Sequence, residues 1–415
     1  MKGRSALERV LDFVFLSSTV WDTHWGTQHQ VARELGRRGA RVLWVELPLS
    51  PLSGLSWGGR GSLARAVGRW REGPRDSGVP GVVVVAPPPV LPFRYHLPFQ
   101  RINQALLGGF VRRAARRAGM EEAVLVSFQA DSGASVSAWE RGKRVYWCAD
   151  DWAASERWWQ PAVLVEARER ELVRGVDLVV ATSRGLGEKL RRMGGRVEVI
   201  PNGVDPALFR PGGGRRPEGG AVVPPPPVVG FAGIMNRYNF DAGLVEGMAR
   251  RHGDWSFLLV GRVEGRGVDL SGLAGLPNVS LAGFQPRECL PWWVERMDVC
   301  LIPWPASKWV ERAFSLKLFE YLAMGKPVVA SRTREYEPYE DVVRLAKGEV
   351  EFERAVEAAL REDSEEMKAR RIALAGENSW ERRVDRFLEV LGRRRGGARG
   401  GAPGAGRGGP ETFRS

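Results

Sequence analysis

Lys317 and Glu320 are the two residues whose types and spacing best suit ligand binding. They lie in residues 315–331, SLKLFEYLAMGKPVVAS. A cation in the first turn of a helix opposes the helix dipole unless an anion binds there too, and a helix N-terminus together with Lys holds phosphate. Glu320 lies one turn further on nearly the same side, where its carboxylate can accept hydrogen bonds from two adjacent hydroxyls, as on a ribose. Phosphate beside a diol outlines a nucleotide; the alternative is an ordinary amphipathic helix with solvated charges.

The capping and helix-ending residues around this pair predict the helix that carries it and the strand that follows. Ser315 is a plausible N-cap, Gly325 ends a helix over residues 315–324, and Pro327 precedes a buried strand at 328–330. Gly just after a helix and Pro soon afterwards are typical of a helix-to-strand join. The pair therefore belongs to an α/β unit.

The same stretch resembles the nucleotide-sugar motif of GT-B glycosyltransferases, in particular the glycosyltransferase 4-like (glycosyl transferases group 1) family. The resemblance implies that Glu320 holds the donor ribose and that Lys317 faces the diphosphate, with Leu318 beside them in the donor site. Many members carry a second Glu eight residues before the first. Here that position is Arg312, with Glu311 beside it.

The N-terminal half alternates strands and helices, which is typical of a parallel sheet. A strand at 13–16, a Trp-rich loop, a helix at 27–38 and a strand at 41–46 open the chain. Gly26 in the loop allows close backbone approach, and ligands bind at the carboxyl edge of such sheets. WGTQHQVARELGRRGARVLWVE resembles the opening segment of the family, whose loop faces the donor diphosphate and sugar. The alternative is a plain strand–helix–strand unit.

Asp150 and Asp151 follow a predicted strand at 144–148. A metal site is not favoured, because adjacent residues on an extended chain point in opposite directions and no third ligand is close in sequence. YWCADDW resembles an acceptor-side loop of the family, so either carboxylate could orient an acceptor hydroxyl or the sugar. In an inverting reaction Asp151 could be the general base. Capping of the next helix is the competing role.

The C-terminal half repeats the alternation after a linker-like stretch, PEGGAVVPPPP, at 217–227. By resemblance, Gly233 after the first strand of this half and the nearby Arg237 meet the diphosphate; a surface-loop role is the alternative for Arg237. VIPNGVD at 199–205, followed by Phe209, is a second strong resemblance. Its Asn-Gly turn is expected to shape the interdomain join rather than to do chemistry.

Composition favours an anionic partner. The net charge is +13, and the six Arg and one Glu beyond Gly392 contribute +5 of it. A basic helix at 101–117 could rest on anionic lipid, although a solvated helix with a core stripe of Ile102, Leu106, Phe110 and Val111 is the competing interpretation. Three cysteines form no disulfide framework or metal spacing, and no run of about 18 apolar residues occurs. We expect a cytoplasmic protein that could associate peripherally with the inner face of the cell membrane.

Together these features predict an α/β GT-B fold, with two Rossmann-like domains facing across a cleft. We expect an acceptor-side domain over 1–210, a linker at 211–227, a nucleotide-sugar domain over 228–377, a helix at 378–392 that crosses back, and a disordered tail at 393–415. The resemblance implies a retaining, metal-independent transfer from a nucleotide diphosphate sugar, without a further cofactor, to a carbohydrate or lipid-linked hydroxyl. No specific nucleic acid is expected. The alternatives are a GT-B sugar-nucleotide 2-epimerase and a basic RNA- or membrane-binding protein.

Overall fold

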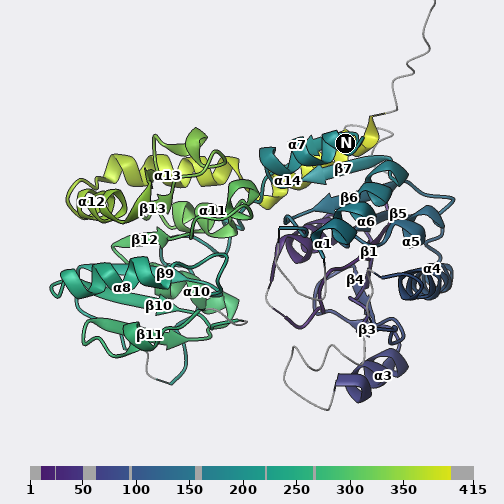
Figure 1. Cartoon of the computed structure of the whole chain (residues 1–415), viewed down its shortest axis with the longest axis horizontal. Helices are drawn as coiled ribbons and strands as arrows, with labels where there is room; N and C mark the ends of the chain where they lie inside the picture. Colours follow the sequence, from purple (N-terminus) through teal and green to yellow (C-terminus); the bar gives the residue numbers. More distant parts are fainter. Residues whose placement is uncertain are drawn as a thin grey trace, which may run out of the picture.

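The computed structural model describes residues 11–23, 25–49, 62–92, 96–154, 161–219, 222–264 and 268–393. The expected disordered tail, 393–415, lies outside these residues except for Arg393. The described chain forms two α/β bodies side by side, each built on its own sheet (Figure 1). This arrangement confirms the predicted fold class.

The N-terminal body has an eight-stranded sheet within the described residues, and its strands are parallel except at one edge. In spatial order the strands are β3 (Arg75–Asp76), β4 (Val82–Val85), β2 (Val42–Val45), β1 (Phe13–Leu16), β5 (Val124–Ser127), β6 (Arg144–Cys148), β7 (Leu178–Ala181) and β8 (Val197–Val199). The helices are α1 (Thr27–Arg37), α3 (Ser62–Glu72), α4 (Phe99–Arg117), α5 (Gly133–Ser137), α6 (Ala162–Gly175) and α7 (Arg184–Arg192).

The C-terminal body has a six-stranded parallel sheet in the described part of the chain. Its spatial order is β11 (Val279–Gly283), β10 (Ser256–Val260), β9 (Val228–Ala232), β12 (Val299–Ile302), β13 (Val328–Ser331) and β14 (Arg344–Ala346). The helices are α8 (Ala242–Arg251), α9 (Ser271–Ala274), α10 (Leu290–Val294), α11 (Leu316–Ala323), α12 (Gly348–Arg361), α13 (Glu365–Glu377) and α14 (Trp380–Gly392). Short 3-10 turns, η1 (Arg287–Cys289), η2 (Val310–Arg312) and η3 (Glu337–Tyr339), join them.

Continuous apolar strands explain the layered packing, because a parallel sheet is covered on both faces. In β1, Phe13 and Phe15 belong to one core cluster, whereas Val14 and Leu16 belong to another on the opposite face. Alternate side chains of a strand point to opposite faces, so helices are required on each side. The carboxyl ends of the parallel strands meet at one edge of each sheet, where the predicted site residues follow them.

Helix α14 returns to the N-terminal body, as Figure 1 shows for the yellow helix beside α7 and β7. Phe387 packs among the core residues of the first sheet, with its ring centroid 5.1 Å from that of Trp147 and 6.2 Å from that of Phe13. Asp385 accepts a hydrogen bond from Arg38 at 2.6 Å. The last helix therefore ties the end of the second body to the core of the first.

One local expectation was wrong. The core stripe of α4 lies elsewhere than its apolar residues suggested. Ile102 and Leu106 are 45% and 49% exposed, whereas Gln100, Asn103 and Gln104 are buried.

Two of those buried polar residues, Asn103 and Gln104, are paired, which explains the orientation of α4. Asn103 makes two 2.8 Å hydrogen bonds with the backbone of Leu91, and Gln104 accepts one from Ser135 Oγ at 2.6 Å. Satisfied amides can face a protein interior at little cost. The helix therefore turns two large apolar side chains outward. Of the described helices, none has the length and apolar character needed to cross a bilayer.

Candidate active site at the junction of the two bodies

The side chain of Lys317 lies against Gly233, in a notch that exists only because glycine has no Cβ. Ser315 caps α11 by accepting a hydrogen bond from the Lys317 backbone N–H at 3.2 Å, which sets the first turn of the helix. Gly233, after β9, has a φ of +148°, and a Cβ placed there would lie 2.2 Å from Lys317 Cε and 2.6 Å from Nζ. The ammonium group also lies 5.1 Å from the centre of the Phe231 ring. The structure thus brings two predicted site residues, Gly233 and Lys317, into direct contact.

Glu320 lies one turn along α11, and its carboxylate faces Arg287 of η1. Arg287 Nη2 and Glu320 Oε1 are 4.0 Å apart, which is an ion pair but too long for a hydrogen bond. Burial raises the pKa of the Glu320 carboxyl, and the positive charges of Arg287 and Lys317 oppose this only in part. Burial likewise lowers the pKa of Lys317, opposed by Glu320. A bound anion and diol would improve the environment of both side chains.

Within the described residues, neither Lys317 Nζ nor the Glu320 carboxylate makes a hydrogen bond. Both side chains are only partly buried, and that of Glu320 is 16% exposed. Buried charged groups are normally paired, so two half-buried groups of opposite charge with unused hydrogen-bonding capacity indicate a ligand site.

The Trp-rich loop of the N-terminal body reaches this helix through Arg287. The Arg287 guanidinium lies 5.9 Å from the centre of the Trp25 ring, on the other side of the interdomain junction. Arg33, on α1, lies 5.7 Å from the same ring and pairs with Asp205 at 2.7 Å. Trp25 therefore places the adjacent Gly26 at the same junction as Glu320.

Asn202 of the VIPNGVD motif links the two bodies through hydrogen bonds of its side-chain amide. Its Oδ1 accepts a hydrogen bond from Thr27 Oγ1 at 2.7 Å, and its Nδ2 donates to the Phe314 carbonyl at 2.8 Å. Thr27 begins α1, and Phe314 immediately precedes the N-cap of α11. This buried amide acts as an interdomain connector, in the role expected for the motif.

Asp151 is held in a buried network of charges. Its two oxygens lie 2.6 Å from Lys189 Nζ and 2.6 Å from Arg312 Nη1, and Lys189 also contacts Glu169 at 2.7 Å. Burial alone would raise the pKa of the Asp151 carboxyl, but Lys189 and Arg312 outweigh it and lower the pKa. The geometry favours a connecting role, because Arg312 belongs to the C-terminal body. A catalytic role for Asp151 stays a prediction.

Asp150 differs from its neighbour. No hydrogen bond or ion pair engages its carboxylate within the described part of the chain, and the side chain is half-buried. Burial, followed by the charge of Asp151, raises the pKa of the Asp150 carboxyl to about 7. Of the two adjacent carboxylates, Asp150 is the one that is free to meet a substrate.

The remaining predicted residues fall into different surroundings. The side chain of Leu318 is fully buried in the core, so only its backbone could face a donor. Arg237 is exposed, donates to Tyr238 Oη at 2.6 Å and lies over that ring at 4.8 Å. Its contact with the diphosphate stays a prediction. Around Gly26 a Cβ would meet nothing within 4 Å.

Sequence reasoning missed Arg287 and the partners of Asp151. Arg287 follows the carboxyl end of β11, so the reasoning that nominated Arg237 after β9 could have nominated it as well. No pattern in the sequence nominates Lys189 as a partner of Asp151. Lys189 meets Asp151 because β6 and β7 are neighbours in the sheet and α7 follows β7.

Replacing Gly233 by Ala should disrupt the Lys317 notch. We expect a loss of about 1–3 kcal/mol in the free energy of unfolding, because the new Cβ overlaps Lys317 and φ lies in a region that L-residues avoid. Denaturant unfolding measures this change. Gly26→Ala is the matched control, since its φ is −113° and its surroundings are open, and it should change stability by less than about 0.5 kcal/mol. Equal effects of the two substitutions on the free energy of unfolding would contradict the close packing of Lys317 against Gly233.

Solved structures of GT-B proteins superpose on nearly the whole chain. Sucrose-phosphate synthase of Thermosynechococcus elongatus superposes with a TM-score of 0.64 at 17% identity, over 92% of this chain and 98% of that one. Anabaena HepE in complex with UDP-glucose superposes with a TM-score of 0.61 at 16% identity, over 92% of this chain and 100% of that one. The protein therefore has the GT-B fold.

The sequence itself matches two glycosyltransferase families. The pattern of Glycosyltransferase Family 4 matches residues 27–208, and that of Glycosyl transferases group 1 matches residues 226–387. Together they cover both bodies, and the chain belongs to these glycosyltransferase families. TuaH of Bacillus subtilis (strain 168), named as a teichuronic acid biosynthesis glycosyltransferase, is 27% identical over 254 residues, or 57% of this chain. The match spans 63% of the length of TuaH.

Proposed function

We propose that the protein transfers a hexosyl or related group from a nucleotide diphosphate sugar to a hydroxyl of a carbohydrate or lipid-linked acceptor, in the synthesis of a cell-surface polysaccharide or glycolipid. The observation that carries this proposal is the pair on α11. Lys317 and Glu320 have hydrogen-bonding capacity that the described residues do not use, and Glu320 faces Arg287, which lies beside Trp25 of the N-terminal body.

The chemistry of the pair matches the two ends of a nucleotide diphosphate. The leaving diphosphate gains negative charge in the transition state, and a preorganised cation at that position stabilises it. Lys317 provides the cation, and Gly233 provides room beside it. Glu320 can accept hydrogen bonds from both ribose hydroxyls, with Arg287 holding its orientation. These protein cations support the proposal that the diphosphate needs no divalent metal.

The similar proteins guide the choice of donor and product. HepE has been solved with UDP, with UDP and glucose, and with UDP-glucose, so uridine diphosphate sugars are the first donors to test. TuaH, whose name assigns it to teichuronic acid biosynthesis, supports a polysaccharide as the product. The family matches favour a transferase over an epimerase or an RNA-binding protein. Retention at the anomeric carbon is proposed on the family resemblance alone.

A thermal-shift panel of nucleotide sugars tests the proposal. We expect one donor class to raise the Tm of the wild-type protein, and Lys317→Ala and Glu320→Ala to reduce that rise. Both substitutions remove a ligand contact at partly exposed positions, so each variant should still fold. Equal shifts in the wild type and both variants, or no shift with any nucleotide sugar, would reject the assignment.

Asp150 is proposed to orient the acceptor hydroxyl. It follows β6, and its neighbour Asp151 pairs with Arg312 three residues before the N-cap of α11, so the loop lies close to the start of the donor helix. An ionised carboxylate accepts the hydroxyl hydrogen more strongly than a neutral one.

The raised pKa of Asp150 predicts the pH dependence of the reaction. Because the carboxyl ionises at about pH 7, kcat/KM should be low below that pH and rise through it. Asp150→Asn should lower kcat/KM and remove the rise, whereas the lowered pKa of Asp151 places its titration far below this range. A rise near pH 7 that survives in Asp150→Asn would assign it to another group.

The outward face of α4 supports a second proposal, that the protein rests on the anionic inner face of the cell membrane. On the helix, Ile102 and Leu106 are 45% and 49% exposed, and Leu97, just before the helix, is 51% exposed. The same helix exposes Arg101, Arg113 and Arg117. Apolar side chains flanked by Arg match the chemistry of an anionic lipid interface. Such a position would suit a lipid-linked acceptor.

Cosedimentation with vesicles tests the membrane proposal. The wild-type protein should bind phosphatidylglycerol vesicles, and the double variant Ile102→Ser/Leu106→Ser should bind about tenfold more weakly, because two exposed apolar side chains no longer enter the interface. Val350→Ser, at an exposed position on α12, should bind like the wild type. Unchanged binding of the double variant would place the lipid contact elsewhere in the chain.

A further inference from the structure

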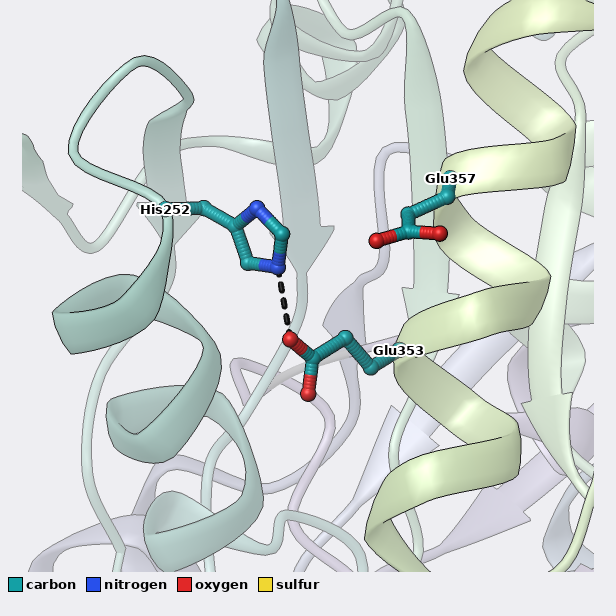
Figure 2. Close-up of side chains that lie close together, drawn as sticks. All are labelled: His252, Glu353 and Glu357. Carbon is teal, nitrogen blue, oxygen red and sulfur yellow. Dashed lines mark hydrogen bonds and ion pairs between the residues drawn. The ribbon is translucent and has the colours of Figure 1, made fainter.

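A second group of ligand-forming side chains lies in the C-terminal body. His252 directly follows α8, and Glu353 and Glu357 lie one turn apart on the facing side of α12 (Figure 2). One nitrogen of the imidazole and one oxygen of each carboxylate all lie within 4.8 Å of one another. The group belongs to neither the donor site nor the interdomain network described above.

His252 is held in a fixed orientation. Its ring stacks on Trp255, with ring centroids 3.7 Å apart and planes 10° from parallel. This stacking directs Nε2 at Glu353, whose Oε1 lies 2.6 Å away. Arg251 contacts both oxygens of Glu353, with Nη2 2.8 Å from Oε2 and Nε 3.2 Å from Oε1. Arg251 therefore fixes the carboxylate with Oε1 toward His252, as outer-shell partners orient metal ligands.

Glu357 is the third member of the group, and it lies at a surface cavity. Figure 2 shows its carboxylate directed toward the imidazole and joined to neither neighbour. Its closest described ion-pair partner, Arg361, is 3.9 Å away and beyond hydrogen-bonding distance. His252 and Glu357 line a surface cavity of about 720 Å³ whose wall also carries three carboxylates, of Asp254, Asp298 and Asp363, and one guanidinium, of Arg361. Carboxylates outnumber the guanidinium in this wall, which favours a cation.

We propose that His252, Glu353 and Glu357 bind a divalent transition-metal ion, with Zn²⁺ the best match. One imidazole nitrogen with two carboxylate oxygens is a ligand set that Zn²⁺ accepts, and small side-chain rotations bring each atom to about 2 Å from a shared ion. The cavity leaves a fourth position for water. The bound ion would fasten the end of α8 to the middle of α12.

Calorimetric titration of the metal-stripped, full-length protein with Zn²⁺ tests this site. We expect one saturable equivalent in the wild type and a rise in Tm on Zn²⁺ addition, because a ligand that binds only the folded state stabilises it. Glu357→Gln should bind at least tenfold more weakly, since it removes one ligand oxygen's charge and leaves the Arg251–Glu353 pair intact. Bound Co²⁺ should give visible absorption that His252→Gln abolishes.

Glu349→Gln is the matched control. Glu349 lies on the same helix and pairs with Arg251 at 2.6 Å, but it is not one of the three ligands, so this variant should bind Zn²⁺ like the wild type. Absence of saturable Zn²⁺ binding by the wild type would overturn the proposal. Equal affinities of Glu357→Gln and Glu349→Gln would overturn it as well.

Discussion

Lys317→Met is expected to lower kcat by about 100- to 1,000-fold, with a much smaller effect on KM. The substitution keeps the length and apolar stem of the side chain in the Gly233 notch but removes the charge. A cation that faces a leaving diphosphate acts mainly in the transition state, and losing one preorganised donor at developing negative charge costs about 3–4 kcal/mol. Release of nucleoside diphosphate from the donor selected by the thermal-shift panel measures the rate.

Lys326→Met is the control for this substitution. Lys326 lies just beyond the end of α11 and donates to the Glu295 carbonyl, away from the donor site. Its kcat should stay within about threefold of the wild type. If the two variants lost activity to the same extent, the charge at position 317 would have no special role.

Lys189→Met is expected to be the most destabilising single substitution in the interdomain network. The carboxylates of Asp151 and Glu169 are 2% and 0% exposed, and Lys189 lies 2.6 and 2.7 Å from them. Burial alone would lower the pKa of Lys189, but these two charges outweigh it and raise the pKa. Without the ammonium group, the partners left among the described residues are Arg312 for Asp151, and the Tyr146 hydroxyl and the Cys148 thiol for Glu169. Removing one member of a buried ionic network costs about 3–5 kcal/mol.

Urea unfolding measures that loss as a lower midpoint. Lys368→Met provides the comparison. Among the described residues Lys368 pairs only with the exposed Glu365, at 3.3 Å, so this variant should change stability by less than about 0.5 kcal/mol. Similar midpoints for the two variants would mean that the network contributes little. In that case the close contacts of Asp151 would need another explanation.

The sequence predicted those features that depend on neighbours along the chain. Apolar runs such as residues 13–16 and 178–181 became strands with almost the expected ends, and Ser315 caps α11 as its position suggested. Lys317 and Glu320 are one turn apart, so their relation follows from helical geometry alone. Local rules are sufficient for features of this kind.

Features that depend on the spatial order of strands could not be predicted in this way. Lys189 reaches Asp151 only because β7 lies beside β6, and Arg287 reaches Glu320 and Trp25 only because the two bodies meet. The orientation of α4 was missed for a related reason. Asn103 faces inward because the Leu91 backbone offers it two hydrogen bonds, and hydrophobic periodicity does not record such partners.

The crystal structure of the protein with a bound nucleoside diphosphate tests the central claim most directly. We predict the diphosphate beside Lys317 Nζ and Gly233, and both ribose hydroxyls within hydrogen-bonding distance of the Glu320 carboxylate. A nucleotide bound elsewhere on the protein, with Lys317 and Glu320 unchanged and still without a ligand, would contradict the account.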